Sequence, residues 1–193
     1  ETRGTNDEIL SIFKESKALL EGHFRLTSGL HSPNYFQCAK VLQYPAYAER
    51  LCTLIAERYR GAKVDAVIAP ALGGIVVGQE VGRLLGVRSL FTERKEGEMQ
   101  LRRGFEIARG ERLLVCEDVV TTGGSVQEVI EIVERAGAVV AGVGIIVDRS
   151  GGKAPFTNLF AAMTMQVVTY QESECPLCKQ GLAIEKPGSR PGA

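Results

Sequence analysis

The stretch LLVCEDVVTTGGS, residues 113–125, decides the fold of this 193-residue chain. It opens with the unbroken apolar run 113–116, which is typical of a strand buried on both faces of a parallel sheet. It ends in threonines, glycines and a serine, directly before the apolar spacing of a helix over 125–135. A glycine-rich turn at a helix N-terminus offers backbone N–H groups and the positive end of the helix dipole to an anion. The stretch therefore predicts a strand, a phosphate-binding loop and a helix.

An acidic pair, Glu117 and Asp118, separates the apolar run from the loop. Two carboxylates so close to a phosphate site must face something other than phosphate, and a ribose diol or a metal ion would suit them. The loop lacks the lysine of the Gly-x-x-x-x-Gly-Lys-Ser/Thr motif, which disfavours a nucleoside triphosphatase of that class.

Apolar and helical segments alternate on both sides of this stretch. The alternation predicts strands at 64–69, 87–91, 112–116 and 138–147, helices at 46–59, 75–85 and 125–135, and one or two edge strands within 161–170. Strands that alternate with helices form a mostly parallel sheet flanked by helices, so we expect an α/β fold.

The two ends of the chain do not continue this alternation of strands and helices. The apolar spacing predicts an opening helix that begins at Asn6 or Asp7 and ends at Gly22, followed by two short strands before Val41. We expect a single domain over 1–193, with a small N-terminal hood over about 1–44 and a frayed tail over about 180–193.

The amino-acid composition disfavours several classes of function. Lys plus Arg and Asp plus Glu are 23 each, so no overall field favours nucleic acid or an anionic membrane. The longest apolar stretch, 138–147, is too short to span a bilayer. Five cysteines are an odd number in a chain large enough to fold without disulfides, so reduced thiols and a cytoplasmic location are expected.

Two further loops follow expected strands. Residues 70–74, PALGG, are either an ordinary tight turn or a second place where backbone N–H groups meet an anion. The segment 93–103 is either a solvated hairpin of mixed charge or a mobile clamp for an anionic leaving group. Its cations are Arg94, Lys95, Arg102 and Arg103.

Residues 113–125 resemble the 5-phosphoribosyl 1-pyrophosphate (PRPP) signature of type I phosphoribosyltransferases. The resemblance implies that family's fold, Glu117, Asp118 and Lys95 as catalytic residues, and a homodimer in which loop 94–103 is shared across the interface. It implies Mg²⁺ carried by PRPP, with no firm direct protein ligand and Asp118 as the candidate. The implied PRPP-binding residues are Arg94, Lys95, Glu117, Asp118, Val119, Val120, Thr121, Thr122, Gly123, Gly124, Ser125, Ala71, Leu72 and Gly73.

The acceptor base is implied by a second resemblance. Residues 22–36, GHFRLTSGLHSPNYF, and the pair Asp148-Arg149 are similar to motifs of orotate phosphoribosyltransferases. This implies transfer of phosphoribose to orotate, which gives orotidine 5′-monophosphate in pyrimidine biosynthesis. Arg149 would meet the orotate carboxylate, and Thr121, Tyr35 and Phe36 would complete the base site. Tyr35 and Phe36 as plain core, and Arg149 as a surface residue, remain open.

The sequence departs from the family at some positions. Gly73 stands where relatives carry a lysine, and the segment 93–103 lacks a histidine found in many of them. Two rival functions remain: a purine phosphoribosyltransferase, which would not need Arg149, and a regulator that senses PRPP, which usually adds a basic DNA-binding module.

Four residues stand outside these motifs. Cys175 and Cys178 have the spacing of half a zinc site, but no second Cys or His pair follows them, which favours thiols without a metal. The two histidines, His23 and His31, are expected to be satisfied surface or core side chains rather than acids or bases.

Overall fold

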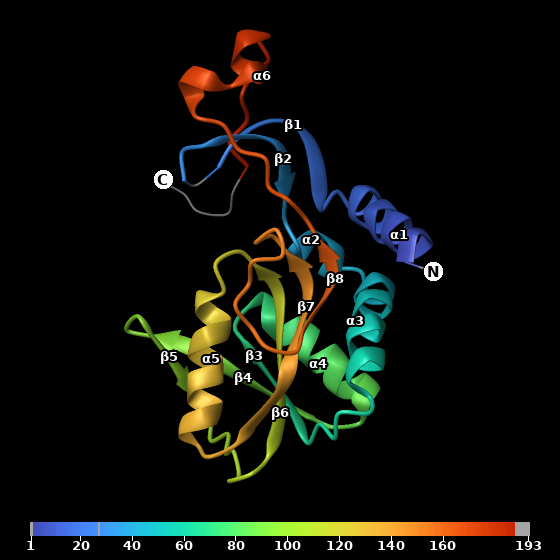
Figure 1. The fold of residues 1–193 in the computed structure, drawn as a ribbon, viewed down its shortest axis with the longest axis vertical. Coiled ribbons are helices and arrows are strands. Elements are labelled where there is room, and N and C mark those ends of the chain that lie inside the picture. The colour runs from blue at the N-terminus through green and yellow to red at the C-terminus, as the bar shows by residue number, and fades with distance from the viewer. Residues whose placement is uncertain (1, 27, 188–193) are drawn as a thin grey trace. The chain divides into compact units, whose positions relative to one another are not determined.

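The structure, a computed structural model, describes residues 2–26 and 28–187 (Figure 1). The chain divides into two compact units. One is the continuous segment Leu42–Met165, and the other combines the described residues up to Val41 with those from Gln166 onward.

The central unit, Leu42–Met165, contains a six-stranded sheet in the order β5-β4-β3-β6-β7-β8. All neighbours pair in parallel except β4 and β5, which are antiparallel. The strands are β3 (Ala66–Pro70), β4 (Arg88–Lys95), β5 (Glu98–Leu101), β6 (Arg112–Val120), β7 (Val139–Asp148) and β8 (Leu159–Thr164).

Helices cover both faces of this sheet. Helices α3 (Pro45–Tyr59) and α4 (Gly73–Leu85) pack against each other, and α4 also contacts β3, β4 and β6. Helix α5 (Gly124–Arg135) lies on the opposite face, in front of the sheet in Figure 1. This three-layer arrangement confirms the predicted α/β fold with a mostly parallel sheet flanked by helices.

The hydrophobic core of the central unit is formed by the middle of the sheet and the helices that pack on it. The middle strands β3, β6 and β7 are almost completely buried, which explains their unbroken apolar sequence. Tyr59 is the last residue of α3, and its buried hydroxyl donates a hydrogen bond to the carbonyl oxygen of Val143 over 2.8 Å. No helix among residues 2–26 and 28–187 is long and apolar enough to cross a membrane.

The other unit begins with helix α1 (Thr2–Glu15) and a hairpin of β1 (Leu19–Arg25) and β2 (His31–Phe36). The single helical turn α2 (Ala39–Leu42) follows. The prediction that the first helix runs to Gly22 is wrong. The backbone leaves the helix at Lys17, where φ is +56°, and Leu19 and Leu20 pair with β2 instead. Their apolar spacing fits a helix, but cross-strand pairing determines their conformation.

The segment from Gln166 onward returns to this hairpin. Tyr170 and His31 exchange two backbone hydrogen bonds, of 2.8 and 2.9 Å. Short helices η1 (Glu172–Glu174) and α6 (Pro176–Lys179) follow. Glu185 then donates its N–H to His23 and accepts one from Arg25, each over 2.8 Å. The described part of the expected tail is therefore attached to β1, and residues 188–193 lie outside the described residues.

Candidate active site

The predicted phosphate-binding loop forms the N-terminus of α5. Gly123 occupies the position before the helix with φ +88°, a left-handed conformation that favours glycine. A Cβ there would also lie 2.6 Å from the ring of Phe156. No side chain caps this helix N-terminus, so its first N–H groups and its positive dipole end are available to an anion.

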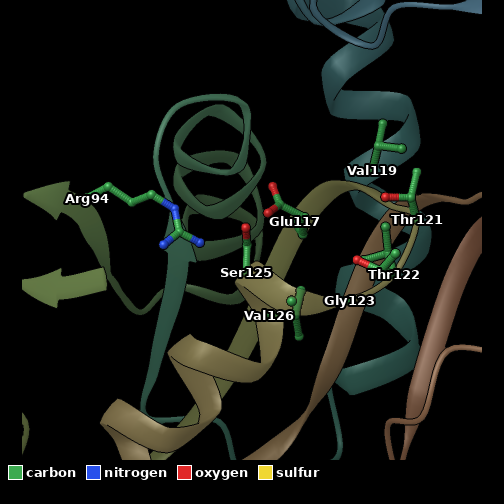
Figure 2. A pocket seen from close by; sticks show the side chains of 10 residues that line it. Arg94, Glu117, Val119, Thr121, Thr122, Gly123, Ser125 and Val126 are labelled. Carbon is green, nitrogen blue, oxygen red and sulfur yellow. The ribbon is translucent and has the colours of Figure 1, made fainter. Parts of the chain in front are cut away.

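A cavity of about 290 Å³ opens at this helix end (Figure 2). The side chain of Arg94 extends from β4 towards Ser125, and the carboxyl group of Glu117, a residue of β6, lies near Ser125. The cavity thus unites two motifs that lie apart in the sequence. It is lined by Arg94, Glu117, Val119, Val120, Thr121, Thr122, Gly123, Gly124, Ser125 and Val126.

The acidic pair lies within β6 rather than after it. The sequence predicts a strand that ends at Cys116, but β6 continues to pair with β7 as far as Val120. Its pairing with β3 ends at Val115, opposite Ile68. The strand therefore extends past its neighbour on one side, and the pair lies in this extension.

Glu117 is buried, with 8% of its surface exposed, and its Oε1 accepts the N–H of Asp118 over 2.9 Å. Burial, reinforced by the neighbouring Asp118 carboxylate, raises the pKa of Glu117 to about 9. Asp118 is half-buried, and its Oδ1 accepts the N–H of Val119 over 2.8 Å. A buried carboxyl beside a second carboxylate is a site that a positive charge would stabilise.

The turn at residues 70–74 contacts the acidic pair. The ideal Cβ position of Gly73 lies 2.1 Å from Asp118 Oδ2, and that of Gly74 lies 2.9 Å from Glu117 Oε1. The turn is tied to β4 by the N–H of Ala71, which donates to the Thr92 carbonyl over 2.8 Å. With this backbone a lysine at position 73 would displace Asp118, which gives a physical reason for the departure from the family pattern.

The cationic segment 93–103 is a β-hairpin of β4 and β5, closed by a two-residue turn. Arg94 forms an ion pair with Glu128 of α5 and donates to the Gly97 carbonyl. Arg103 makes a bidentate contact with Glu93, over 2.7 and 2.8 Å. Lys95 is exposed at the end of β4. In this conformation Arg94 alone of the predicted clamp residues lines the described cavity.

The backbone of Arg149 lies next to the start of the phosphate loop. Its backbone N–H donates to the carbonyl of Val120 over 2.8 Å, at the point where β6 ends and the loop starts. Asp148 is 2% exposed and its Oδ1 accepts the N–H of Ser150 over 2.7 Å. This contact fixes the turn after β7 and holds the Arg149 backbone beside Thr121.

Tyr35 and Phe36 belong to the other unit. Phe36 is buried and packs edge-on against Phe13, with ring centroids 5.0 Å apart. Tyr35 is half-buried and its hydroxyl donates to Gln37 Oε1 over 3.2 Å. Phe36 thus has a core role, and contact of either residue with a base stays a prediction.

One group of side chains was missed in the sequence. His23, His31, Cys175 and Cys178 present ligand-type atoms that all lie within 4.8 Å of one another. The second pair lies upstream of the cysteines, whereas a zinc motif was expected to continue downstream. The usable signal was that both histidines lie in the region of the two expected short strands, on either side of Ser28 and Gly29.

Comparison with known proteins agrees with this geometry. The family model described as phosphoribosyl transferase domain matches residues 38–167. The chain is 59% identical to an orotate phosphoribosyltransferase of Chlorobaculum parvum, over 98% of both chains. It is 57% identical to one of Chlorobium phaeobacteroides, over 94% of this chain and 95% of that one.

Among solved structures, an orotate phosphoribosyltransferase from Aeropyrum pernix superposes with a TM-score of 0.70 at 24% identity. The match covers 81% of this chain and 93% of that one, and it supports the fold. Taken with the helix-terminal loop and the buried acidic pair, these matches lead to one conclusion: the chain belongs to the phosphoribosyltransferase family and, within it, to the orotate phosphoribosyltransferases.

Proposed function

We infer that this chain transfers the phosphoribosyl group of PRPP to N1 of orotate, giving orotidine 5′-monophosphate and pyrophosphate in pyrimidine biosynthesis. The observation that carries this function is the uncapped N-terminus of α5, which opens on a cavity whose wall includes the buried Glu117. An anion site and an acidic pair side by side suit a substrate that joins phosphate to a ribose diol.

The loop Thr121–Ser125 holds the 5′-phosphate of PRPP. Its backbone N–H groups and hydroxyls donate to phosphate oxygens, and the helix dipole stabilises their negative charge. Gly123 and Gly124 add no side chains of their own to the loop, so the phosphate can approach its backbone closely.

Glu117 and Asp118 accept hydrogen bonds from the ribose hydroxyls. As the bond to pyrophosphate breaks, positive charge grows on the ribose, and two nearby carboxylates stabilise it. The donor set also fits Mg²⁺, because Asp118 offers carboxylate oxygens beside a buried acid that lacks a cationic partner among the described residues. When bound with PRPP, Mg²⁺ supplies positive charge to the pyrophosphate oxygens.

The turn Ala71–Gly73 and the cations of the hairpin hold the pyrophosphate. Gly73 and Gly74 bring backbone close to the acidic pair, so the turn can present N–H groups near the breaking bond. Arg94 lines the cavity already, and Lys95 lies next to it in β4. Cations at the leaving group stabilise its departure.

Arg149 selects the base. Orotate carries a carboxylate on a flat ring, which a guanidinium can bind through two parallel hydrogen bonds. The hydrogen bond from the Arg149 N–H to Val120 places this residue beside Thr121, which would hold the other ring edge.

The working assembly is a homodimer in which segment 94–103 of one chain serves the site of its partner. The hairpin projects from the sheet edge beyond β4, and its exposed Lys95 is available to a neighbouring chain (Figure 1). Arg94 lines the cavity of its own chain in this conformation, so Lys95 is the residue by which sharing of the segment is tested.

The deciding experiment is a base-competition assay with PRPP and Mg²⁺. Orotate, uracil, adenine and guanine are supplied together, and the nucleotide products are separated by chromatography. The proposed function requires orotidine 5′-monophosphate as the main product. Adenosine or guanosine monophosphate would instead identify a purine enzyme, and tight PRPP binding without any product would indicate a sensor.

A further inference from the structure

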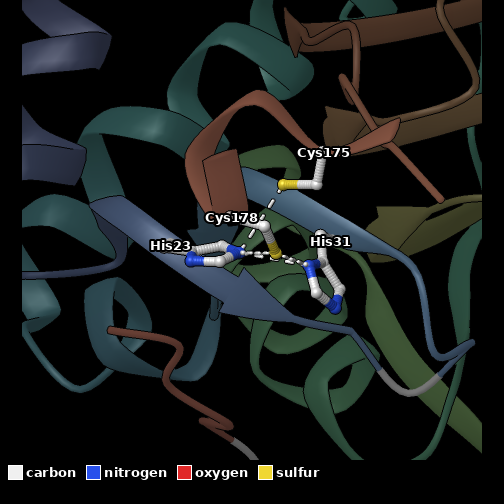
Figure 3. A group of neighbouring side chains, drawn as sticks. All are labelled: His23, His31, Cys175 and Cys178. Atoms are coloured by element: carbon white, nitrogen blue, oxygen red, sulfur yellow. Dashed lines mark hydrogen bonds between the residues drawn. The ribbon is translucent and has the colours of Figure 1, made fainter. Parts of the chain in front are cut away.

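The unit built from both ends of the chain contains a cluster of two histidines and two cysteines that phosphoribosyl transfer does not use. His23 lies on β1 and His31 on β2, facing the same side of the hairpin (Figure 3). Cys175 immediately precedes α6, and Cys178 lies within it. The histidines and the cysteines are separated by more than 140 residues of chain, yet their side chains converge on one point.

The distances within the cluster match those between the ligands of a tetrahedral metal ion. His23 Nε2 and His31 Nδ1 are 3.1 Å apart. Cys175 Sγ lies 3.6 Å from His23 Nε2, and Cys178 Sγ lies 3.6 and 3.3 Å from the two histidine nitrogens. Ideal zinc bond lengths give about 3.3 Å between two nitrogens and about 3.5 Å between nitrogen and sulfur.

The protonation of His23 also suits a metal ligand. Its Nδ1 lies 2.9 Å from the carbonyl oxygen of Leu182, which can only accept a hydrogen bond. The proton therefore resides on Nδ1, and Nε2 directs its lone pair at the cluster. A histidine whose other nitrogen donates to a backbone carbonyl is the usual arrangement around protein-bound metals.

We propose that His23, His31, Cys175 and Cys178 bind one structural Zn²⁺ ion. Two thiolates and two neutral imidazoles around a divalent cation sum to zero charge, which suits a site where both histidines and Cys175 are buried. Nitrogen and sulfur in tetrahedral arrangement select zinc over magnesium or calcium. The four ligand atoms are too close together to hold a two-iron cluster between them.

The ion gives this unit stability that its small core does not supply. The unit has about 70 residues, a size at which a hydrophobic core alone gives little stability and a metal or disulfide is common. Its three cysteines, Cys38, Cys175 and Cys178, are free thiols, so no disulfide connects α6 to the hairpin. Four protein ligands leave no open position, so the ion is structural rather than catalytic.

The first experiment measures the metal content of the purified full-length protein by plasma mass spectrometry. We expect about one zinc per chain after dialysis against a weak chelator, and at least a tenfold lower content in Cys178→Ser. Cys38→Ser is the matched control, because Cys38 is a buried thiol of the same unit outside the cluster, and it should keep its zinc. Equal zinc content in the three proteins would place the metal elsewhere.

A second measurement keeps the inference testable if Cys178→Ser does not fold. Wild-type protein stripped of metal is titrated with Co²⁺, and we expect intense tetrahedral visible bands with a sulfur-to-cobalt charge-transfer band, saturating at about one equivalent. In Cys178→His the charge-transfer band should weaken by about half while one cobalt still binds. An unchanged spectrum, no zinc in wild type, or a Cys175–Cys178 disulfide found by mass spectrometry in protein purified without oxidant would overturn the proposal.

Discussion

The ideal Cβ position of Gly73 lies 2.1 Å from Oδ2 of Asp118, so the turn after β3 and the acidic pair of β6 touch without a side chain between them. Gly73→Ala should push the Asp118 carboxylate out of place and lower kcat/KM at least tenfold, or about 1.4 kcal/mol. Gly61→Ala is the matched control, because Gly61 has open space around it. Full activity in Gly73→Ala would show that the position of Asp118 does not matter.

Glu117→Gln and Asp118→Asn should each lower turnover at least tenfold, or about 1.4 kcal/mol, because the positive charge that develops on the bound ribose favours the ionised form of both side chains, and each variant removes one of these carboxylates. Steady-state kinetics with PRPP and orotate measure the effect, and circular dichroism verifies folding. If both folded variants retain nearly the full rate, the ribose role assigned to the pair is wrong.

Glu117→Gln should also change how stability depends on pH. The pKa of Glu117 is raised to about 9 in the fold by burial, so between its ordinary pKa and 9 the folded state binds the extra proton. The contribution of Glu117 to the free energy of unfolding is therefore fully present at low pH and decreases as pH rises through that range. The variant should therefore gain about 1–3 kcal/mol over wild type near pH 8.5 and little near pH 5.

Urea unfolding at both pH values measures this gain. Glu131→Gln, at an exposed position of α5, is the control and should show no pH-dependent difference from wild type. A gain in Glu117→Gln that is the same at both pH values would mean that Glu117 ionises normally in the fold.

Arg149→Ala should weaken orotate binding by roughly 2–5 kcal/mol, the cost of losing a charge-assisted contact in a partly desolvated site. PRPP affinity should change little, because the phosphate loop belongs to a different strand end. Arg149→Lys should restore only part of the loss, since an ammonium keeps the charge without the planar fork. Titration calorimetry with each ligand separates the outcomes, and equal losses for both ligands would indicate a structural arginine.

Mixing Lys95→Ala with Asp118→Asn tests the shared hairpin. If Lys95 serves the partner's site, half of the dimers in an equal mixture are hybrids with one intact site each, and activity should recover to about a quarter of wild type. Mass spectrometry of the intact dimers verifies subunit exchange. No recovery after exchange would favour a hairpin that serves its own chain.

Apart from β5, whose residues form no apolar run, the order of helices and strands in the central unit was predictable because the other strands contain compact apolar runs and each helix has its own apolar spacing. The extension of β6 to Val120 was not. Polar residues ended the expected strand at Cys116, whereas pairing with β7 continues along the backbone regardless of the acidic side chains. Leu19 and Leu20 were assigned to a helix because their apolar spacing fits one. Local spacing cannot reveal that a partner strand pairs with them.

The features of the candidate site also differ in whether the sequence could predict them. The phosphate loop and acidic pair are contiguous in the sequence and could be recognised there. The contact of Gly73 with Asp118 depends on how two strands end relative to each other. The association of His23 and His31 with Cys175 and Cys178 depends on the last segment returning to the first hairpin, which no local pattern encodes.

That return has a consequence for the order of folding during synthesis. The segment Leu42–Met165 is continuous and contains its whole sheet, so it can fold once it has left the ribosome. The β1–β2 hairpin is translated early but must wait for Tyr170, Cys175 and Glu185 before its pairing is complete. A nascent chain that has left the ribosome as far as residue 165 would therefore carry a folded sheet and an N-terminal hairpin whose histidines are still exposed, and the emergence of residues 166–185 would remove them from solvent.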